Sequence, residues 1–160
     1  IINQQLSNNV ANIIYLRLLK ILGNSECISP QQILDTDPIK MRDIGISLSK
    51  VKFIYDLSKS LINNPKMLTQ WKKMNDEKAF MNIQKLNGFG PWSASIILLF
   101  YLNRHDIFPV NDATLKKGLL KIFDISLSVD LQEIDWAKPY RGYLALYVWK
   151  WVDNGMKDLF

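Results

Sequence analysis

Cysteine and histidine are scarce in this chain of 160 residues, which contains one of each. A single cysteine, Cys27, excludes an intrachain disulfide framework, a four-cysteine zinc site and an iron–sulfur cluster held by cysteines. It also suits a reducing, intracellular setting. A single histidine, His105, argues against metal sites and catalytic triads built on histidine. We therefore expect no cofactor for catalysis.

Long apolar runs are also lacking. The longest, from Ile96 to Leu102, is far shorter than the roughly 20 residues needed to span a membrane, and no signal peptide is evident, so we expect no membrane partner. The composition, 48% hydrophobic and 22% charged, is typical of a globular domain, and the length predicts one domain, with two lobes as an option. The chain starts at Ile1 rather than methionine, which leaves a missing upstream segment open.

Charge gives a weak indication of an anionic partner. The net charge is +5, but many basic proteins bind nothing acidic, so nucleic acid remains one option among others. Lys116, Lys117 and Lys121 could approach DNA phosphates, although such a run more often forms a solvated helix face.

Helix-capping residues, some of them followed by a proline at the first helical position, recur along the whole chain. This pattern predicts an all-α fold. Ser29–Pro30 and Asp37–Pro38 each place a capping residue before a proline at the first helical position. Ser47 or Ser49 can cap a following amphipathic helix, and Asn75 can cap another. No alternating stretch has the pattern of a β-hairpin.

Residues 84–92 interrupt two apolar helical runs with Leu86-Asn87-Gly88-Phe89-Gly90, after which a helix restarts at Pro91. This is the pattern of a helix–hairpin–helix. The two glycines permit positive φ and close approach of another molecule. Backbone N–H groups at the start of the second helix could hold a phosphate oxygen. A plain turn between two helices, whose glycines only cap a helix, remains the alternative.

Three stretches carry a family resemblance: "LNGFGPWSASIILLF", "DIFPVNDATLKKG" and "WAKPYRGYLALYVWKW". In this order and spacing they resemble the DNA-3-methyladenine glycosylase II group of the helix–hairpin–helix (HhH-GPD) DNA glycosylases. The resemblance covers nearly the whole chain. It implies one domain over residues 1–160, with two helical lobes around a cleft joined by the hairpin, and without the family's β-rich N-terminal extension.

The resemblance assigns catalysis to Asp112, within the segment 106–118, because the aspartate that ends a Pro-x-x-Asp motif has this role in the family. An ionised carboxylate can stabilise the positive charge that develops on the deoxyribose and can orient or activate water. Asp112 could instead simply cap the next helix, with Asn111 as the competing cap. Capping and catalysis are compatible, since a cap fixes the carboxylate in space.

Trp92 and Trp149 match the family positions that form an aromatic pocket for a flipped base. Such a pocket favours cationic alkylated purines, although a tryptophan on an apolar helix is otherwise usually core. Tyr143 and Tyr147 are assigned to the core. Ile96, where some relatives carry an aromatic residue, departs from the pattern and leaves the substrate range open.

Relatives that cut the DNA strand through a Schiff base have a lysine where this chain has Trp92. Lys85 precedes the hairpin and should point elsewhere. No activated amine is therefore evident, and we expect water to be the nucleophile.

Further DNA contacts follow from the resemblance. Gln5 matches the residue that fills the gap left by the flipped base, with Gln4 as the next candidate and an ordinary polar helix start as the alternative. Gly88, Gly90 and Pro91 are expected to meet the DNA backbone. The backbone carbonyls of Gln84, Leu86 and Phe89 are expected to bind Na⁺ or K⁺.

The sequence thus predicts a monofunctional DNA glycosylase of base excision repair, which hydrolyses the N-glycosidic bond of alkylated purines such as 3-methyladenine. A glycosylase for deaminated or oxidised bases and a non-catalytic DNA-binding module are the alternatives. The expected partner is double-stranded DNA containing damaged bases. We expect a monomer located with the DNA, in a prokaryotic cytoplasm and nucleoid or in a nucleus.

Overall fold

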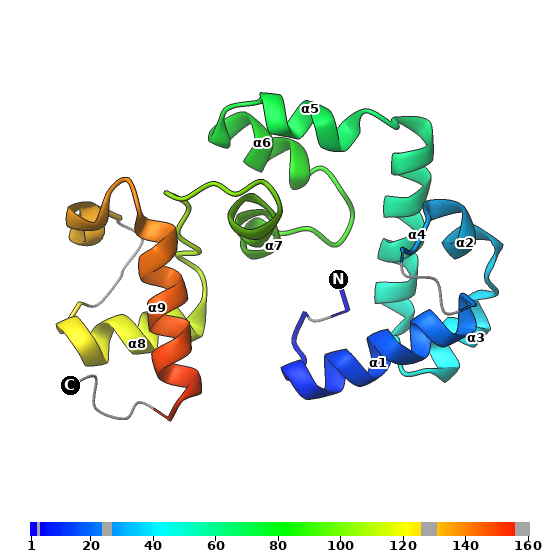
Figure 1. Ribbon diagram of the computed structural model, residues 1–160, viewed down its shortest axis with the longest axis horizontal. Coiled ribbons are helices and arrows are strands. Elements are labelled where there is room, and N and C mark those ends of the chain that lie inside the picture. The colour runs from blue at the N-terminus through cyan, green and yellow to red at the C-terminus, as the bar shows by residue number, and fades with distance from the viewer. Residues whose placement is uncertain (3, 24–26, 126–130, 156–160) are drawn as a thin grey trace. The chain divides into compact units, whose positions relative to one another are not determined.

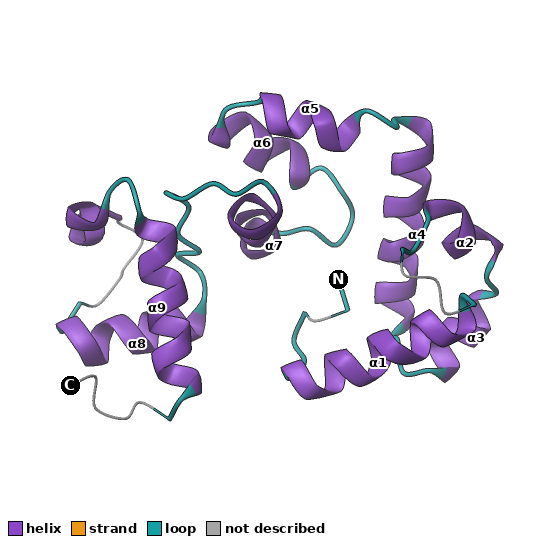
Figure 2. Ribbon diagram, viewed as in Figure 1, coloured by secondary structure: helices purple, strands orange, loops and turns teal. Residues whose placement is uncertain are grey.

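The computed structural model describes residues 1–2, 4–23, 27–125 and 131–155, and its regular structure is helical throughout these ranges (Figures 1 and 2). The all-α prediction is confirmed. The chain forms two compact units: residues 1–73 with 85–89, and residues 74–84 with 90–160. Within the described ranges, none of the helices combines the length and apolarity needed to cross a membrane.

The first unit contains five helices: α1 (Asn8–Ile21), α2 (Pro30–Asp35), α3 (Pro38–Asp43), α4 (Leu48–Asn63) and α5 (Met67–Lys73). The predicted caps are present, since Ser29 and Asp37 accept hydrogen bonds from the first turns of α2 and α3. Of the two candidates for α4, Ser47 is the cap. The apolar faces of α1 to α4 meet in one core, whose largest fully buried side chain is Met41.

The second unit contains α6 (Asp76–Ile83), α7 (Pro91–Ile96), the π-helix η1 (Ile97–Tyr101), α8 (Ala113–Phe123), the 3₁₀ segment η2 (Leu131–Ala137) and α9 (Arg141–Asp153). Asn75 caps α6 as predicted. Helices α8 and α9 pack closely because Gly118 leaves room for Val148. A Cβ atom at Gly118 would lie 2.3 Å from Val148 Cγ1.

The assignment of Tyr143 and Tyr147 to the core is wrong. Their exposed fractions are 51% and 47%, whereas the buried residues of α9 are Gly142, Leu144, Ala145 and Val148. Both tyrosines lie on the solvent side because residues four apart share a helix face, and the opposite face of α9 is the one that packs on α8.

The two glycines of the hairpin have different conformations. Gly88 has φ +83°, and a Cβ atom there would lie 2.3 Å from the Phe53 ring, so the fold itself requires glycine. Gly90 has φ −81° and ψ −176°, an extended conformation open to any residue, so the positive φ that glycine permits is not used at this position. Among the described residues, and apart from its two neighbours in the chain, no atom lies within 4 Å of a Cβ built at Gly90. The fold therefore does not explain the glycine at position 90.

Candidate active site

Asp112 is fixed at the start of α8. Its amide N–H donates to the Pro109 carbonyl at 2.9 Å, and its Oδ1 accepts a hydrogen bond from the Leu115 N–H at 2.8 Å. Asp112, rather than Asn111, is thus the N-cap of α8. The cap bond therefore fixes the carboxylate at the N-terminal end of α8.

Two indole N–H groups converge on the same carboxylate. Trp92 Nε1 donates to Asp112 Oδ2 at 2.7 Å, and Trp149 Nε1 donates to Asp112 Oδ1 at 3.2 Å. Trp92 comes from the first turn of α7 and Trp149 from the C-terminal half of α9. The structure therefore brings together the three residues that the resemblance assigned to catalysis and to the base pocket.

Phe100 is a neighbour of this site that the sequence analysis missed. Its ring stacks on Trp149, with centroids 6.2 Å apart and ring planes 21° apart, and 59% of its surface is exposed. A usable signal was present, because Trp92, Ile96 and Phe100 are spaced by four residues along one helical run.

The segment that leads to Asp112 is anchored at its start by α9. Arg141 donates to both oxygens of Asp106, from Nε at 2.8 Å and from Nη2 at 2.7 Å. The Gly142 N–H donates to the His105 carbonyl at 2.7 Å. The hydrogen bonds from Arg141 hold the pKa of the Asp106 carboxyl below its usual range, and Asp106 in turn raises the pKa of Arg141. The first turn of α9 therefore holds this segment at residues 105 and 106. Trp149, further along α9, holds it at Asp112.

A cavity of about 280 Å³ adjoins one side of the site. Trp92 and Pro109 line it, together with the polar side chains of Ser95, Asp106 and Arg141, whereas Asp112 is not among its lining residues. Trp92 therefore both donates a hydrogen bond to the Asp112 carboxylate and lines this cavity.

The first unit contains the N-terminal glutamines and the turn of the hairpin. Gln4 Nε2 donates to the Gly88 carbonyl at 2.9 Å, and Lys50 Nζ donates to the carbonyls of Ile2 and Gln4 at 3.0 and 2.6 Å. Gln5 is exposed and has φ +58°. Gln4 thus ties the N-terminal segment to the hairpin turn, while the side chain of Gln5 is the one presented to solvent.

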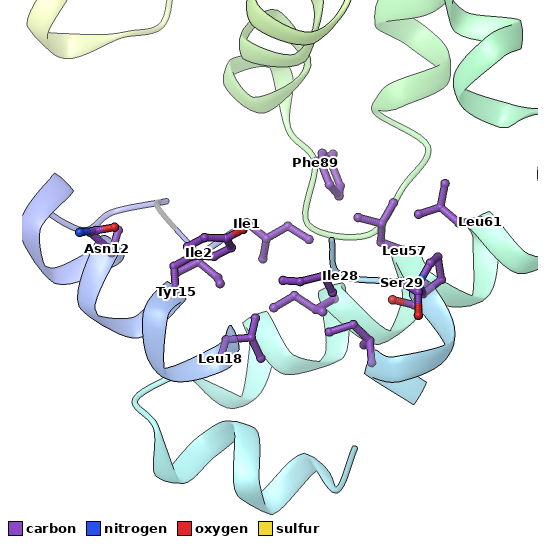
Figure 3. A pocket seen from close by; sticks show the side chains of 15 residues that line it. Ile1, Ile2, Asn12, Tyr15, Leu18, Ile28, Ser29, Leu57, Leu61 and Phe89 are labelled. Carbon is purple, nitrogen blue, oxygen red and sulfur yellow. The ribbon is translucent and has the colours of Figure 1, made fainter. Parts of the chain in front are cut away.

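A cavity of about 680 Å³ lies in the first unit (Figure 3). Isoleucine and leucine side chains from the N-terminus, from α1, α2 and α4 and from Ile28 make up about half of its lining, and the polar side chains of Asn12, Tyr15, Ser29 and Ser58 also line it. The Phe89 ring of the hairpin reaches it, whereas Gln5, Trp92, Asp112 and Trp149 do not line it. Of the predicted site residues, only Phe89 is therefore among the residues that line this cavity.

The lysines that the sequence singled out lie at exposed or half-buried positions. Lys85, which precedes the hairpin, is exposed. Lys117 and Lys121 are exposed on α8, and Lys116 is half-buried there. Among the described residues, no three side chains of His, Cys, Asp or Glu are grouped so as to hold a metal ion.

The chain is similar in sequence to known DNA glycosylases. The DNA-3-methyladenine glycosylase of Saccharomyces cerevisiae is 32% identical over 170 residues, covering 99% of this chain and 57% of the relative. DNA-3-methyladenine glycosylase 1 of Schizosaccharomyces pombe is 26% identical over 153 residues, covering 92% of this chain and 67% of the relative. The chain thus spans little more than half of the budding-yeast protein and two thirds of the fission-yeast protein.

A solved structure has the same fold. The 3-methyladenine DNA glycosylase of Schizosaccharomyces pombe in complex with abasic DNA matches with a TM-score of 0.80 at 25% identity, covering 93% of this chain and 75% of that chain. The model of the HhH-GPD superfamily of base excision DNA repair proteins matches residues 1–131, well over half of the chain. The chain therefore belongs to the HhH-GPD superfamily of base excision DNA repair proteins.

Proposed function

We propose that this protein is a DNA glycosylase that removes alkylated purines such as 3-methyladenine by hydrolysing their N-glycosidic bond. The observation that carries the proposal is the Asp112 carboxylate, held by a helix N-terminus and by the indole N–H groups of Trp92 and Trp149. A module that only binds the DNA backbone needs neither a fixed carboxylate nor aromatic side chains around it.

The chemistry follows from the charge that develops as the bond breaks. Departure of the base leaves positive charge on the deoxyribose, as in glycoside hydrolysis, and a fixed anion beneath the sugar lowers the energy of that state. Asp112 supplies the anion and orients or activates the attacking water. The base leaves with the bonding electron pair, and water provides the hydroxyl group that remains on the sugar.

Aromatic faces near the carboxylate favour an alkylated base. Trp92, Trp149 and the stacked Phe100 offer π-surfaces on which a flipped purine can stack. A purine that carries positive charge after alkylation gains a cation–π contribution that an undamaged purine lacks.

The hairpin and the N-terminal segment are proposed to hold the DNA backbone. Gly90 is the N-cap of α7 and, as a glycine, supplies no capping side chain, so a phosphate can approach the backbone at this helix start. The open space beside Gly90 and the exposure of Pro91 suit close approach of a backbone. Gln5, rather than Gln4, is proposed to fill the gap left by the flipped base, because the Gln4 amide already donates to Gly88.

A monovalent cation at the hairpin is proposed from the resemblance. The carbonyls of Gln84, Leu86 and Phe89 follow the C-terminal end of α6, where helix carbonyls are partially negative. Neutral carbonyl oxygens suit Na⁺ or K⁺. The Leu86 carbonyl also accepts the Phe89 N–H at 3.1 Å, which fixes its direction.

Excision assays test the proposed function. Duplex oligonucleotides, each carrying one lesion, would be incubated with the protein and then treated with alkali to reveal abasic sites. We expect release of 3-methyladenine and 7-methylguanine above that of uracil, hypoxanthine or 8-oxoguanine. Preferential release of a deaminated or oxidised base would favour the alternative substrate class, and no release from any duplex would contradict a glycosylase.

A further inference from the structure

We propose that Trp92 and Trp149 act as positioning residues for Asp112 through their indole N–H groups, in addition to offering their ring faces to a base. This inference rests on the proposed function. It assigns to the two side chains a role in the chemical step that stacking alone would not give them.

The geometry of the carboxylate supports this role. The cap bond from Leu115 fixes only Oδ1, and rotation about the terminal bond of an aspartate side chain is otherwise broad. The bond from Trp92 at 2.7 Å fixes Oδ2, and the bond from Trp149 adds a second donor to Oδ1. Together the three donors determine the orientation of the carboxylate plane.

The number of acceptor sites leaves room for substrate. An ionised carboxylate offers about four lone-pair sites. Leu115, Trp92 and Trp149 occupy three of them. One site therefore remains for a water molecule or for the sugar, and the three donors decide which way that site faces.

The kind of donor matters as much as the number. Indole and backbone N–H groups are neutral, so Asp112 keeps its full negative charge for the developing sugar cation. Asp106 provides a contrast within the same unit, because the guanidinium of Arg141 pairs with it and cancels its charge. Among the ion pairs formed by the described residues, none involves Asp112. Neutral donors orient the Asp112 carboxylate without neutralising it.

Tryptophan-to-phenylalanine variants separate the two roles of the side chain, because phenylalanine keeps an aromatic face and lacks the N–H. Single-turnover excision at saturating protein gives the rate of the chemical step, and a binding titration gives Kd for the same lesion duplex. For Trp92→Phe we expect the chemical rate to fall by about 10- to 100-fold, the range set by one hydrogen bond to a charged group. Kd should stay within about threefold, and Trp149→Phe, whose bond is longer, should lose less.

Trp136→Phe is the matched control. Trp136 lies in η2, is 60% exposed and packs against Phe123, so the same chemical change there should alter neither the rate nor Kd. A weaker Kd with an unchanged chemical rate in Trp92→Phe would show that its ring face alone matters, and would overturn the inference. An unchanged rate and Kd in both pocket variants would also overturn it.

A spectroscopic measurement tests the contact without activity. The chain has five tryptophans, so its ¹H–¹⁵N spectrum should contain five indole N–H signals, which single Trp→Phe variants assign. Asp112→Asn replaces an anionic acceptor by a neutral amide, so the signals of Trp92 and Trp149 should move and that of Trp136 should not. Unmoved signals at both pocket tryptophans would overturn the inference. Shifted signals in a protein that releases no base would instead show that the proposed function, rather than the contact, is at fault.

Discussion

Arg141 holds Asp106 through two hydrogen bonds, from Nε to Oδ1 at 2.8 Å and from Nη2 to Oδ2 at 2.7 Å. The Arg141 side chain is only 13% exposed, so solvent screens this pair less than a surface pair. A neutral residue at position 106 removes the charged partner at hydrogen-bond distance and leaves Arg141 with only the longer ion pair to Asp135, at 3.6 Å. We expect Asp106→Asn to lower the free energy of unfolding by about 1.5–3 kcal/mol, the range for hydrogen bonds to charged groups. Urea denaturation at neutral pH measures this loss.

The same pair should make stability depend on pH in the acid range. Because folding lowers the pKa of the Asp106 carboxyl, the unfolded chain binds more protons there, and stability rises with pH through that window. The contribution of the pair to the free energy of unfolding is fully present above the usual aspartate pKa of about 3.9. It is lost as the pH falls through the lower pKa that Asp106 has in the folded protein. The stability gap between wild type and Asp106→Asn should therefore narrow below about pH 4. A gap that stays constant down to pH 2 would contradict the role of this pair.

Asp112→Asn tests the catalytic assignment. The amide keeps the shape and the capping ability of the side chain but removes the negative charge that the sugar cation needs, so base release should fall by at least about 100-fold. Binding to a lesion duplex should survive within roughly tenfold, because phosphate and stacking contacts are unchanged. Gel-resolved excision and fluorescence anisotropy measure the two quantities. Excision close to the wild-type rate would remove Asp112 from the mechanism.

Strand cleavage distinguishes water from an amine nucleophile. Incubation with lesion DNA and borohydride should trap no covalent adduct, since Trp92 occupies the position where strand-cutting relatives have a lysine. Strand breaks should appear only after heat or alkali. Efficient trapping would show that one of the lysines attacks the sugar.

Substitutions at the two hairpin glycines, Gly90 and Gly88, form a matched pair that separates a role in DNA binding from a role in the fold. Gly90→Val should fold normally, because its backbone is extended and no atom lies within 4 Å of the new Cβ. If the α7 amides hold a phosphate, the valine should weaken binding to damaged and undamaged duplexes alike, since phosphate contacts carry little sequence information. The salt dependence of affinity should be steep for wild type.

Gly88→Ala serves as the opposite case. A side chain at this position meets the Phe53 ring and a positive φ, so the variant should lose stability. Thermal melting of both variants checks this contrast. A Gly90→Val protein with a wild-type melting curve and unchanged duplex affinity would mean that the hairpin does not contact DNA.

Several helix starts, the family and three residues of the candidate site could be predicted from the sequence, because the signals for them are local. Capping residues at Ser29, Asp37, Asn75 and Asp112 act on N–H groups two or three positions away, so their effect survives in any tertiary context. The order of the hairpin, the Pro-x-x-Asp segment and the final helix was enough to indicate the family. Asp112 and its two tryptophans were named on that basis alone.

Other features were decided only by long-range packing. Which face of α9 is buried depends on how α8 lies against it, and therefore Tyr143 and Tyr147 could not be placed by spacing. Gly88 is required because the Phe53 ring of α4 lies beside it, whereas Gly90 has no such neighbour. The two indole bonds to one carboxylate and the pairing of Arg141 with Asp106 join residues far apart in the chain. A sequence pattern records which residues are present, but the distance and direction between such residues exist only once the helices have packed.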